Sequence, residues 1–310
     1  MVNRIGPLTA GWTFICFGLL ASSGLPLLDS FCLALSSIST GGFMPRSGGL
    51  NVYDSVFVET VIGIFMFVGA TSVVWHYLIV KARWNAVRQY REGPLMLVAV
   101  LIAGLVFAYG FHYGVDGPSG LGWGDALLQG VLTSLSVIST TGFEIREGGF
   151  AAVTLPVLIT LGLIGGAGYS TAGGIKLFRI GAMLVQAARE LRRLIYPHGV
   201  RPTHFGGQIY DIQIMKSVWS SLLMFLILVS GTTVFLGFTE FTFEAALLAT
   251  ISSVANVGPL YEALVPLHEG WKEFSEVHPY SRMILAGTMI AGRLEILAIL
   301  AVINLSYWRS

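Results

Sequence analysis

The sequence ALSSISTGGF at residues 34–43 returns as SLSVISTTGF at residues 134–143, with seven of ten residues the same. A third stretch, TISSVANVGP at residues 250–259, keeps the two central serines of the first copy and the glycine. Self-similarity of this kind indicates a chain built from repeated units. Each copy ends in residues that do not prolong a helix, so each predicts a short helix followed by irregular backbone.

The composition of the 310 residues is that of a membrane protein. Only 11% are charged, 54% are hydrophobic, the net charge is +1 and the mean hydropathy is +0.74. Soluble domains have about a quarter of their residues charged, so the composition argues against a soluble enzyme and against a nucleic-acid binder. Cys16 and Cys32 lie in apolar stretches and are interpreted as small core residues. The six histidines have no metal-ligand spacing.

Five stretches without any charged residue are long enough for a helix across the bilayer, which needs about 20 residues. A sixth, 281–308, is apolar apart from Arg282, Arg293 and Glu295, which should face protein or water because charges are costly in lipid. The five uncharged stretches are 5–28, 60–80, 93–115, 148–175 and 217–239.

Three shorter uncharged stretches, 30–45, 126–143 and 245–261, alternate with these spans. Irregular backbone at membrane depth is tolerated only where it is buried or lines a cavity, so we interpret them as re-entrant. The predicted fold is an all-α integral membrane protein of three helix–pore loop–helix repeats, with about six transmembrane helices and three re-entrant pore helices. The units are 1–92, 93–215 with a broken second helix and a basic linker, and 216–310.

The loop charges predict the orientation. One side of the membrane collects twelve cations against three carboxylates, and the other collects 13 carboxylates against four cations. The positive-inside rule makes the first side cytoplasmic, together with both termini. The pore loops then enter from outside, where an acidic rim would concentrate cations. An alternative for the opening apolar run, up to Gly24, is a signal peptide.

The ends of the three repeated stretches predict an ion-selectivity filter. A pore helix that enters from outside points its negative carbonyl end at the membrane centre, and carbonyls of the returning chain can replace the hydration shell of a cation. The alternative is that small residues merely allow close helix packing. The predicted filter residues are Ser39, Thr40, Gly41, Gly42, Ser139, Thr140, Thr141, Gly142, Ala255, Asn256, Val257 and Gly258.

Five glycines within residues 165–174 predict a break in the fourth span, because each glycine weakens a helix by up to about 1 kcal/mol. We interpret the break as a gate, with a kink for helix packing as the alternative. Arg293 holds this gate shut by donating to its carbonyls or acts as an electrostatic barrier below the filter; the alternative is a structural pair with Glu295. The predicted gate residues are Gly165, Gly166, Gly168, Ser170, Thr171, Gly173, Gly174, Lys176 and Arg293.

With these motifs in view, the chain resembles the Trk/Ktr/HKT superfamily of potassium transporters, most closely its bacterial TrkH branch. STGGF, STTGF and ANVGP are similar to the second, third and fourth filter segments of that superfamily. GGAGYSTAGGIK (165–176) is similar to its broken helix, RRLIYPHGV (192–200) to its cytoplasmic linker, and AGRLEI (291–296) to its last helix.

The resemblance implies potassium uptake across a prokaryotic cytoplasmic membrane, with potassium as substrate at the filter and no cofactor bound by this chain. It implies a homodimer in lipid, with a cytosolic, nucleotide-binding regulatory subunit of the TrkA type. Gly42, Gly142 and Gly258 would go with a preference for potassium. A first repeat of the superfamily has no counterpart here, so we expect this polypeptide alone not to form a sufficient pore. It would be a fragment or one part of a split transporter whose other chain supplies that repeat.

Three rival functions stay open. A non-conducting subunit would follow from the unmatched repeat, and a symporter that couples potassium to sodium or protons would share the same framework. An intramembrane serine hydrolase would use Ser170 and would need a histidine or lysine base nearby. His76 and His112 fall near opposite faces of the membrane, and neither has an evident partnership with Ser170.

Overall fold

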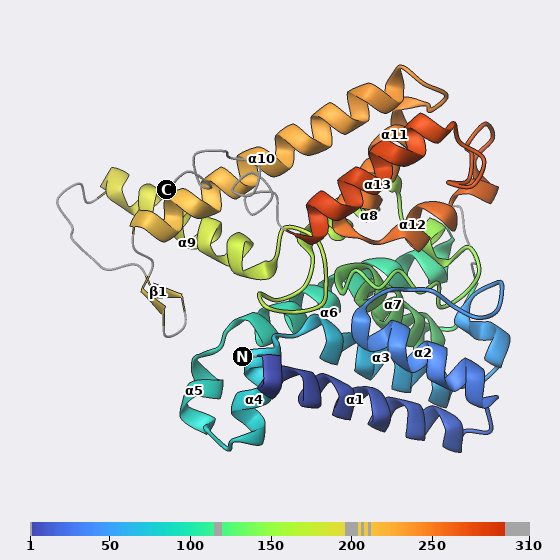
Figure 1. Cartoon of the computed structure of the whole chain (residues 1–310), viewed down its shortest axis with the longest axis horizontal. Coiled ribbons are helices and arrows are strands. Elements are labelled where there is room, and N and C mark those ends of the chain that lie inside the picture. The colour runs from blue at the N-terminus through green and yellow to red at the C-terminus, as the bar shows by residue number, and fades with distance from the viewer. Residues whose placement is uncertain (1, 115–119, 196–203, 206–207, 210–211, 295–310) are drawn as a thin grey trace.

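The computed structural model describes residues 2–114, 120–195, 204–205, 208–209 and 212–294 (Figure 1). The regular elements of these residues are helices, apart from one strand pair in which β1 (His204–Phe205) pairs antiparallel with β2 (Gln208–Ile209). The all-α prediction is confirmed. The helices are α1 (Val2–Ser22), α2 (Leu27–Ser39), η1 (Leu50–Tyr53), α3 (Val56–Ala70), α4 (Val73–Val80), α5 (Trp84–Gln89), α6 (Glu92–Tyr113), α7 (Trp123–Ile138), η2 (Gly149–Ala152), α8 (Leu155–Ile164), α9 (Leu177–Ile195), α10 (Ile212–Gly237), α11 (Phe243–Ala255), α12 (Gly258–Glu262), η3 (Val265–Leu267) and α13 (Pro279–Arg293).

The three short uncharged stretches form α2, α7 and α11, which we call the pore helices. They have 13, 16 and 13 residues, fewer than the roughly 20 needed to cross a bilayer. Each has one acidic residue in its first turn, Asp29, Asp125 or Glu244. A carboxylate there is favourable because the N-terminal end of a helix carries partial positive charge.

Two helices of the described part are long and apolar enough to cross a membrane on their own. These are α6 and, within α10, Gln213–Gly237, and the bent pair α3 and α4 makes a third if it counts as one span. The other predicted spans coincide with α1, α8 and α13, whose apolar helical lengths are shorter. The predicted helix 5–28 is wrong at its end, because α1 stops at Ser22 and Leu27 already begins a pore helix.

The predicted single helix over 60–80 is also wrong. It breaks after Ala70, and α3 and α4 meet at 99°. Thr71 ends α3, with its N–H on the carbonyls of Phe67 and Val68 and its side-chain Oγ1 2.8 Å from His76 Nε2. The backbone groups freed by the break find partners in the glycine-rich stretch 165–176, which is why a continuous apolar sequence adopts a bend here.

The fourth span contains the predicted interruption. Helix α8 ends at Ile164, residues 165–176 form no helix, and α9 begins at Leu177. In the last span α13 ends at Arg293, whereas the predicted continuation over 296–308 and Glu295 lie outside the described residues.

The pair α6 and α7 lies at the centre of the fold, between α1–α3 and the group α10, α11 and α13 (Figure 1). Two hydrophobic clusters meet on it. Phe107 and Val137 belong to the cluster around α11, whereas Val100 and Ile138 belong to the cluster around α1–α3. Because α7 is packed on opposite faces, its C-terminal end is the most enclosed of the three pore-helix ends.

Candidate functional site

The three pore helices end with the same backbone turn. One residue in each adopts a left-handed conformation, with φ of 53°, 57° and 57°, and none of the three is glycine. Its N–H donates three residues back, and the next N–H donates five residues back, as in a Schellman-type helix end. The left-handed residues are Thr40, Thr140 and Asn256.

This turn is strained at two of the three sites. A β-branched residue with positive φ is an outlier among proteins, and such conformations cluster at functional sites, where the surroundings enforce them. Thr40 and Thr140 both have this conformation and are both buried. All three left-handed residues belong to the predicted filter set.

All three repeats have a serine at one position, and in two of them its hydroxyl braces the returning chain. Ser136 Oγ donates to the Phe143 carbonyl at 2.6 Å, and Ser252 Oγ donates to the Val257 carbonyl at 2.5 Å. The equivalent Ser36 hydroxyl is buried and has no hydrogen-bond partner among the described residues. These serines are not among the predicted filter residues, although serine is present at this position in every copy.

The filter segments converge. A Cβ on Gly42 would overlap the Thr141 carbonyl oxygen and lie 3.1 Å from Pro259 Cγ. A Cβ on Gly142 would lie 2.9 Å from Val257 Cγ1 and 3.4 Å from Pro259 Cβ. Both glycines have positive φ, 74° and 78°. Residues predicted from three distant parts of the sequence therefore come together, and glycine is required at both positions.

The third segment departs from the prediction. Gly258 has no positive φ and no atom within 4 Å of an added Cβ, because it begins helix α12. Pro259 is in the first turn of that helix, where proline is favoured because its fixed φ suits a helix start. The extended return predicted for all three segments is therefore cut short in the third, where only Val257 lies between the left-handed Asn256 and helix α12.

The loops outside the filter are held by carboxylates. Arg46 Nε lies 2.6 Å from Asp29 Oδ2 in the first pore helix. Glu144, two residues after Gly142, accepts the Gly148 N–H at 2.6 Å through its side chain and the Leu50 N–H at 2.8 Å through its carbonyl. Burial raises the pKa of the Glu144 carboxyl to about 7, although the N–H of Gly148 opposes this shift.

The stretch 165–176, which we call the glycine-rich segment, lies across the carbonyl ends of all three pore helices. Thr171 Oγ1 donates to the Ile38 carbonyl at 2.9 Å, and the Gly173 N–H donates to Thr140 Oγ1 at 2.6 Å. A Cβ on Gly173 would overlap the Ala255 carbonyl oxygen and lie 2.6 Å from its carbon. The segment therefore closes off the point on which the pore helices converge.

Three cationic side chains donate to carbonyls of this segment. Arg293 donates to Thr171, Lys176 to Ala172, and Arg179 to Ile175. The contact from Arg293 is the one predicted for a residue that holds the segment in place.

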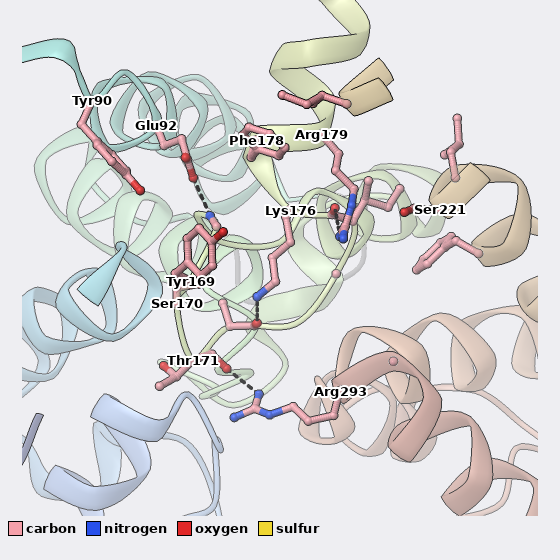
Figure 2. Close-up of a pocket in the computed structure, with 18 residues that line it drawn as sticks. Tyr90, Glu92, Tyr169, Ser170, Thr171, Lys176, Phe178, Arg179, Ser221 and Arg293 are labelled. Carbon is pink, nitrogen blue, oxygen red and sulfur yellow. Dashed lines mark hydrogen bonds between the residues drawn. The ribbon is translucent and has the colours of Figure 1, made fainter. Parts of the chain in front are cut away.

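A cavity of about 930 Å³ lies beside the segment, between the starts of α6 and α9, the first half of α10 and the end of α13. Figure 2 shows Arg293 reaching the segment from one side and Glu92 from the other.

The arrangement around Ser170 is not that of an activated nucleophile. Its hydroxyl donates to the Ala167 carbonyl at 2.6 Å. His76 bonds to Thr71 instead, and His112 Nδ1 lies 2.8 Å from the Leu121 carbonyl oxygen. Within the described part of the chain, neither histidine is hydrogen-bonded to Ser170.

A family profile described as TrkH, a cation transport protein, matches residues 96–306, more than half of the chain. The chain belongs to the TrkH family of cation transport proteins. Several Trk system potassium uptake proteins are similar to this chain along most of its length. The Trk system potassium uptake protein TrkH of Vibrio parahaemolyticus is 29% identical over 301 residues, covering 93% of this chain and 58% of the relative. TrkH of Salmonella typhimurium is 28% identical over 308 residues, covering 96% and 60%.

The fold agrees with the family. The crystal structure of the potassium transporter TrkH from Vibrio parahaemolyticus has a TM-score of 0.81 and 24% sequence identity, and the match covers 96% of this chain and 63% of the other. TrkG of Escherichia coli is 23% identical over 300 residues, or 59% of its length. The chain thus spans about three fifths of the curated relatives it matches.

Proposed function

We propose that this chain contributes the ion pathway of a potassium uptake protein in a bacterial cytoplasmic membrane. The observation that carries the proposal is the convergence of three pore-helix ends, with the same backbone turn, on one glycine-rich segment. The uptake function named for the relatives supports potassium as the substrate.

In this proposal the filter residues bind dehydrated potassium through backbone carbonyls. The C-terminal end of a helix carries partial negative charge, and three such ends face one point. Carbonyl oxygens can replace the water around the ion, and the braces from Ser136 and Ser252 would keep the returning chain from collapsing when the ion leaves. Gly42 and Gly142 give the chain the conformation that this packing requires.

The glycine-rich segment is the proposed gate. It contacts the end of each pore helix, so an ion that leaves the filter meets it next. Arg293 would hold the gate closed through the Thr171 carbonyl. Moving the segment toward the neighbouring cavity would open the path to the cytosol.

The proposed assembly is a homodimer with a cytosolic, nucleotide-binding regulatory subunit and with a further chain or segment that completes the filter. Both termini are proposed to be cytoplasmic, from the distribution of loop cations. Arg189, Arg192 and Arg193 on α9 would face the regulatory subunit or anionic lipid headgroups.

Uptake of radioactive rubidium, a potassium analogue, by cells that lack their own potassium uptake systems tests this function. Cells that carry the complete gene should take up rubidium faster than cells with an empty vector, and excess potassium should compete better than excess sodium. Uptake equal to that of the vector control, or equal competition by sodium, would reject the proposal.

A further inference from the structure

The two halves of the glycine-rich segment both contact the end of α3, where Thr171 donates to the Gly69 carbonyl through its N–H and its Oγ1, but they differ in their other partners. Arg293 and Thr140 contact the half that contains Thr171 and Gly173. The other half, 166–169, makes no hydrogen bond to either of them within the described part of the chain. The contacts of this first half are with the bend between α3 and α4, with the start of α6, and with the start of α9, where the Leu177 N–H donates to the Gly166 carbonyl at 2.9 Å.

The bend and the first half are paired through their backbones. The Ala167 N–H donates to the Ala70 carbonyl at 2.9 Å, and the Val73 N–H donates to the Tyr169 carbonyl at 3.2 Å. Backbone groups freed by two helix breaks therefore satisfy each other, as groups buried away from water require. This pairing accounts for the bend, which the sequence did not predict.

Between these two bonds the Gly168 N–H has a side-chain acceptor. It donates to Glu92 Oε2 at 2.5 Å. Glu92 is the first residue of α6, is 7% exposed, and lines the cavity (Figure 2). Hydrogen bonds to a charged acceptor are about twice as strong as neutral ones. The bond from Gly168 to Glu92 would therefore contribute much of the interaction energy that keeps residues 166–169 in place.

We propose that Glu92 is a positioning residue of the gate: by accepting the Gly168 N–H it fixes the first half of the segment against the bend between α3 and α4. The reference to a gate rests on the proposed function. The positioning itself rests on contacts that exist whether or not the chain conducts ions.

Glu92 and Arg293 therefore act on opposite sides of Ser170. Loss of Arg293 would remove one donor to the second half, whereas loss of Glu92 would remove the side-chain acceptor that positions the first half. Both changes should raise the exposure of Ser170 to the cavity, but only the effect of Glu92 should depend on an acceptor oxygen at that position.

The test is the rate at which a membrane-impermeant thiol reagent, applied from the cytoplasmic side, modifies a Ser170→Cys variant in the full chain. The background carries Cys32→Ser, because Cys32 is partly exposed whereas Cys16 is buried. Glu92→Ala should raise the rate about tenfold, the change expected from losing one hydrogen bond to a charged group. Glu92→Gln keeps an acceptor oxygen at the same reach but lacks the charge, so its rate should lie between those of the parent and Glu92→Ala.

The matched control is Glu59→Ala. Glu59 is also buried, at 5% exposure, and is bonded through Oε2 to Gln129 Nε2 at 2.9 Å, with no hydrogen bond to the segment. An unchanged rate in Glu92→Ala would overturn the proposal. An equal rise in Glu59→Ala would also overturn it, because the effect would then be general loosening. A Glu92→Gln rate as high as that of Glu92→Ala would exclude the hydrogen bond as the cause.

Labelling needs no transport, so the two proposals fail separately. If the labelling pattern holds and the complete gene carries no rubidium, the transport function fails and the positioning role stands. If rubidium uptake is present and labelling does not respond to Glu92→Ala, the positioning role fails alone.

Discussion

Gly292→Ala should destabilise the protein, because the end of α13 presses on a pore helix at this residue. A Cβ on Gly292 would overlap the Val254 carbonyl oxygen and lie 2.7 Å from its carbonyl carbon and 3.0 Å from its Cα. All three atoms are backbone. Unlike a side chain, they cannot rotate away, and the neighbouring Ala255 carbonyl is already in contact with Gly173.

Two opposing effects set the magnitude. Alanine is about 1 kcal/mol more favourable than glycine inside a helix, whereas overpacking a filled interior typically costs about 1–3 kcal/mol. Because the atoms in contact are backbone and cannot move aside, the overpacking cost should be near the upper limit of about 3 kcal/mol. The free energy of unfolding of Gly292→Ala should therefore be about 2 kcal/mol lower than that of the parent. Gly287 on the same helix has no atom within 4 Å of an added Cβ, so Gly287→Ala should instead be as stable as the parent or more so.

The assay is unfolding of the two variants in mild detergent by added denaturing detergent, followed by circular dichroism. Gly292→Ala should unfold at a clearly lower denaturant concentration than Gly287→Ala, with a difference of about 3 kcal/mol between them. Equal midpoints would refute the close approach of α13 to α11 and, with it, the placement of Arg293 beneath the filter.

Three further outcomes follow from the site. Arg293→Ala should raise rubidium uptake by the complete transporter, since the Thr171 carbonyl loses its donor; unchanged uptake would count against a gating role. Gly42→Ala, which forces a side chain onto the Thr141 carbonyl at a φ of 74°, should abolish selective uptake, and potassium-selective uptake in this variant would contradict the proposed filter. Burial raises the pKa of Glu144 from 4.5 to about 7, so the folded state favours the protonated carboxyl. The contribution of this group to the free energy of unfolding should therefore be fully present below about pH 4.5 and be lost as the pH rises through about 7. Glu144→Gln should remove that part of the pH dependence of the melting temperature. If the melting temperatures of the parent and of Glu144→Gln change with pH in the same way, this role of Glu144 is disproved.

Much of the candidate site was predictable because its signals are local. The pore helices follow from short uncharged runs that end in non-helical residues, and the repeat marks where their ends lie. The glycine density of 165–174 predicts the helix break without any knowledge of its neighbours, since backbone propensity acts residue by residue.

The errors concern residues whose conformation depends on distant partners. The apolar stretch 60–80 has no glycine cluster or proline at its break, and it bends because the glycine-rich segment offers backbone partners there. Gly258 begins a helix instead of an extended strand, owing to Pro259. From the sequence, Glu92 is one of several charges at a predicted membrane boundary. Its role depends on the Gly168 N–H, which only the folded chain brings to its carboxylate.

The amino-acid sequence alone therefore determined that the chain is a helical membrane protein with three short apolar helices that end in non-helical backbone and one broken helix, because hydrophobic length and backbone propensity depend on local sequence. Only the tertiary structure decided that the three ends converge, that a second helix breaks to pair with the first, and that Glu92 and Arg293 hold one segment from opposite sides. Those features join residues separated by 33 to 133 positions, and hydrogen bonds of that span arise only when distant parts of the chain pack together.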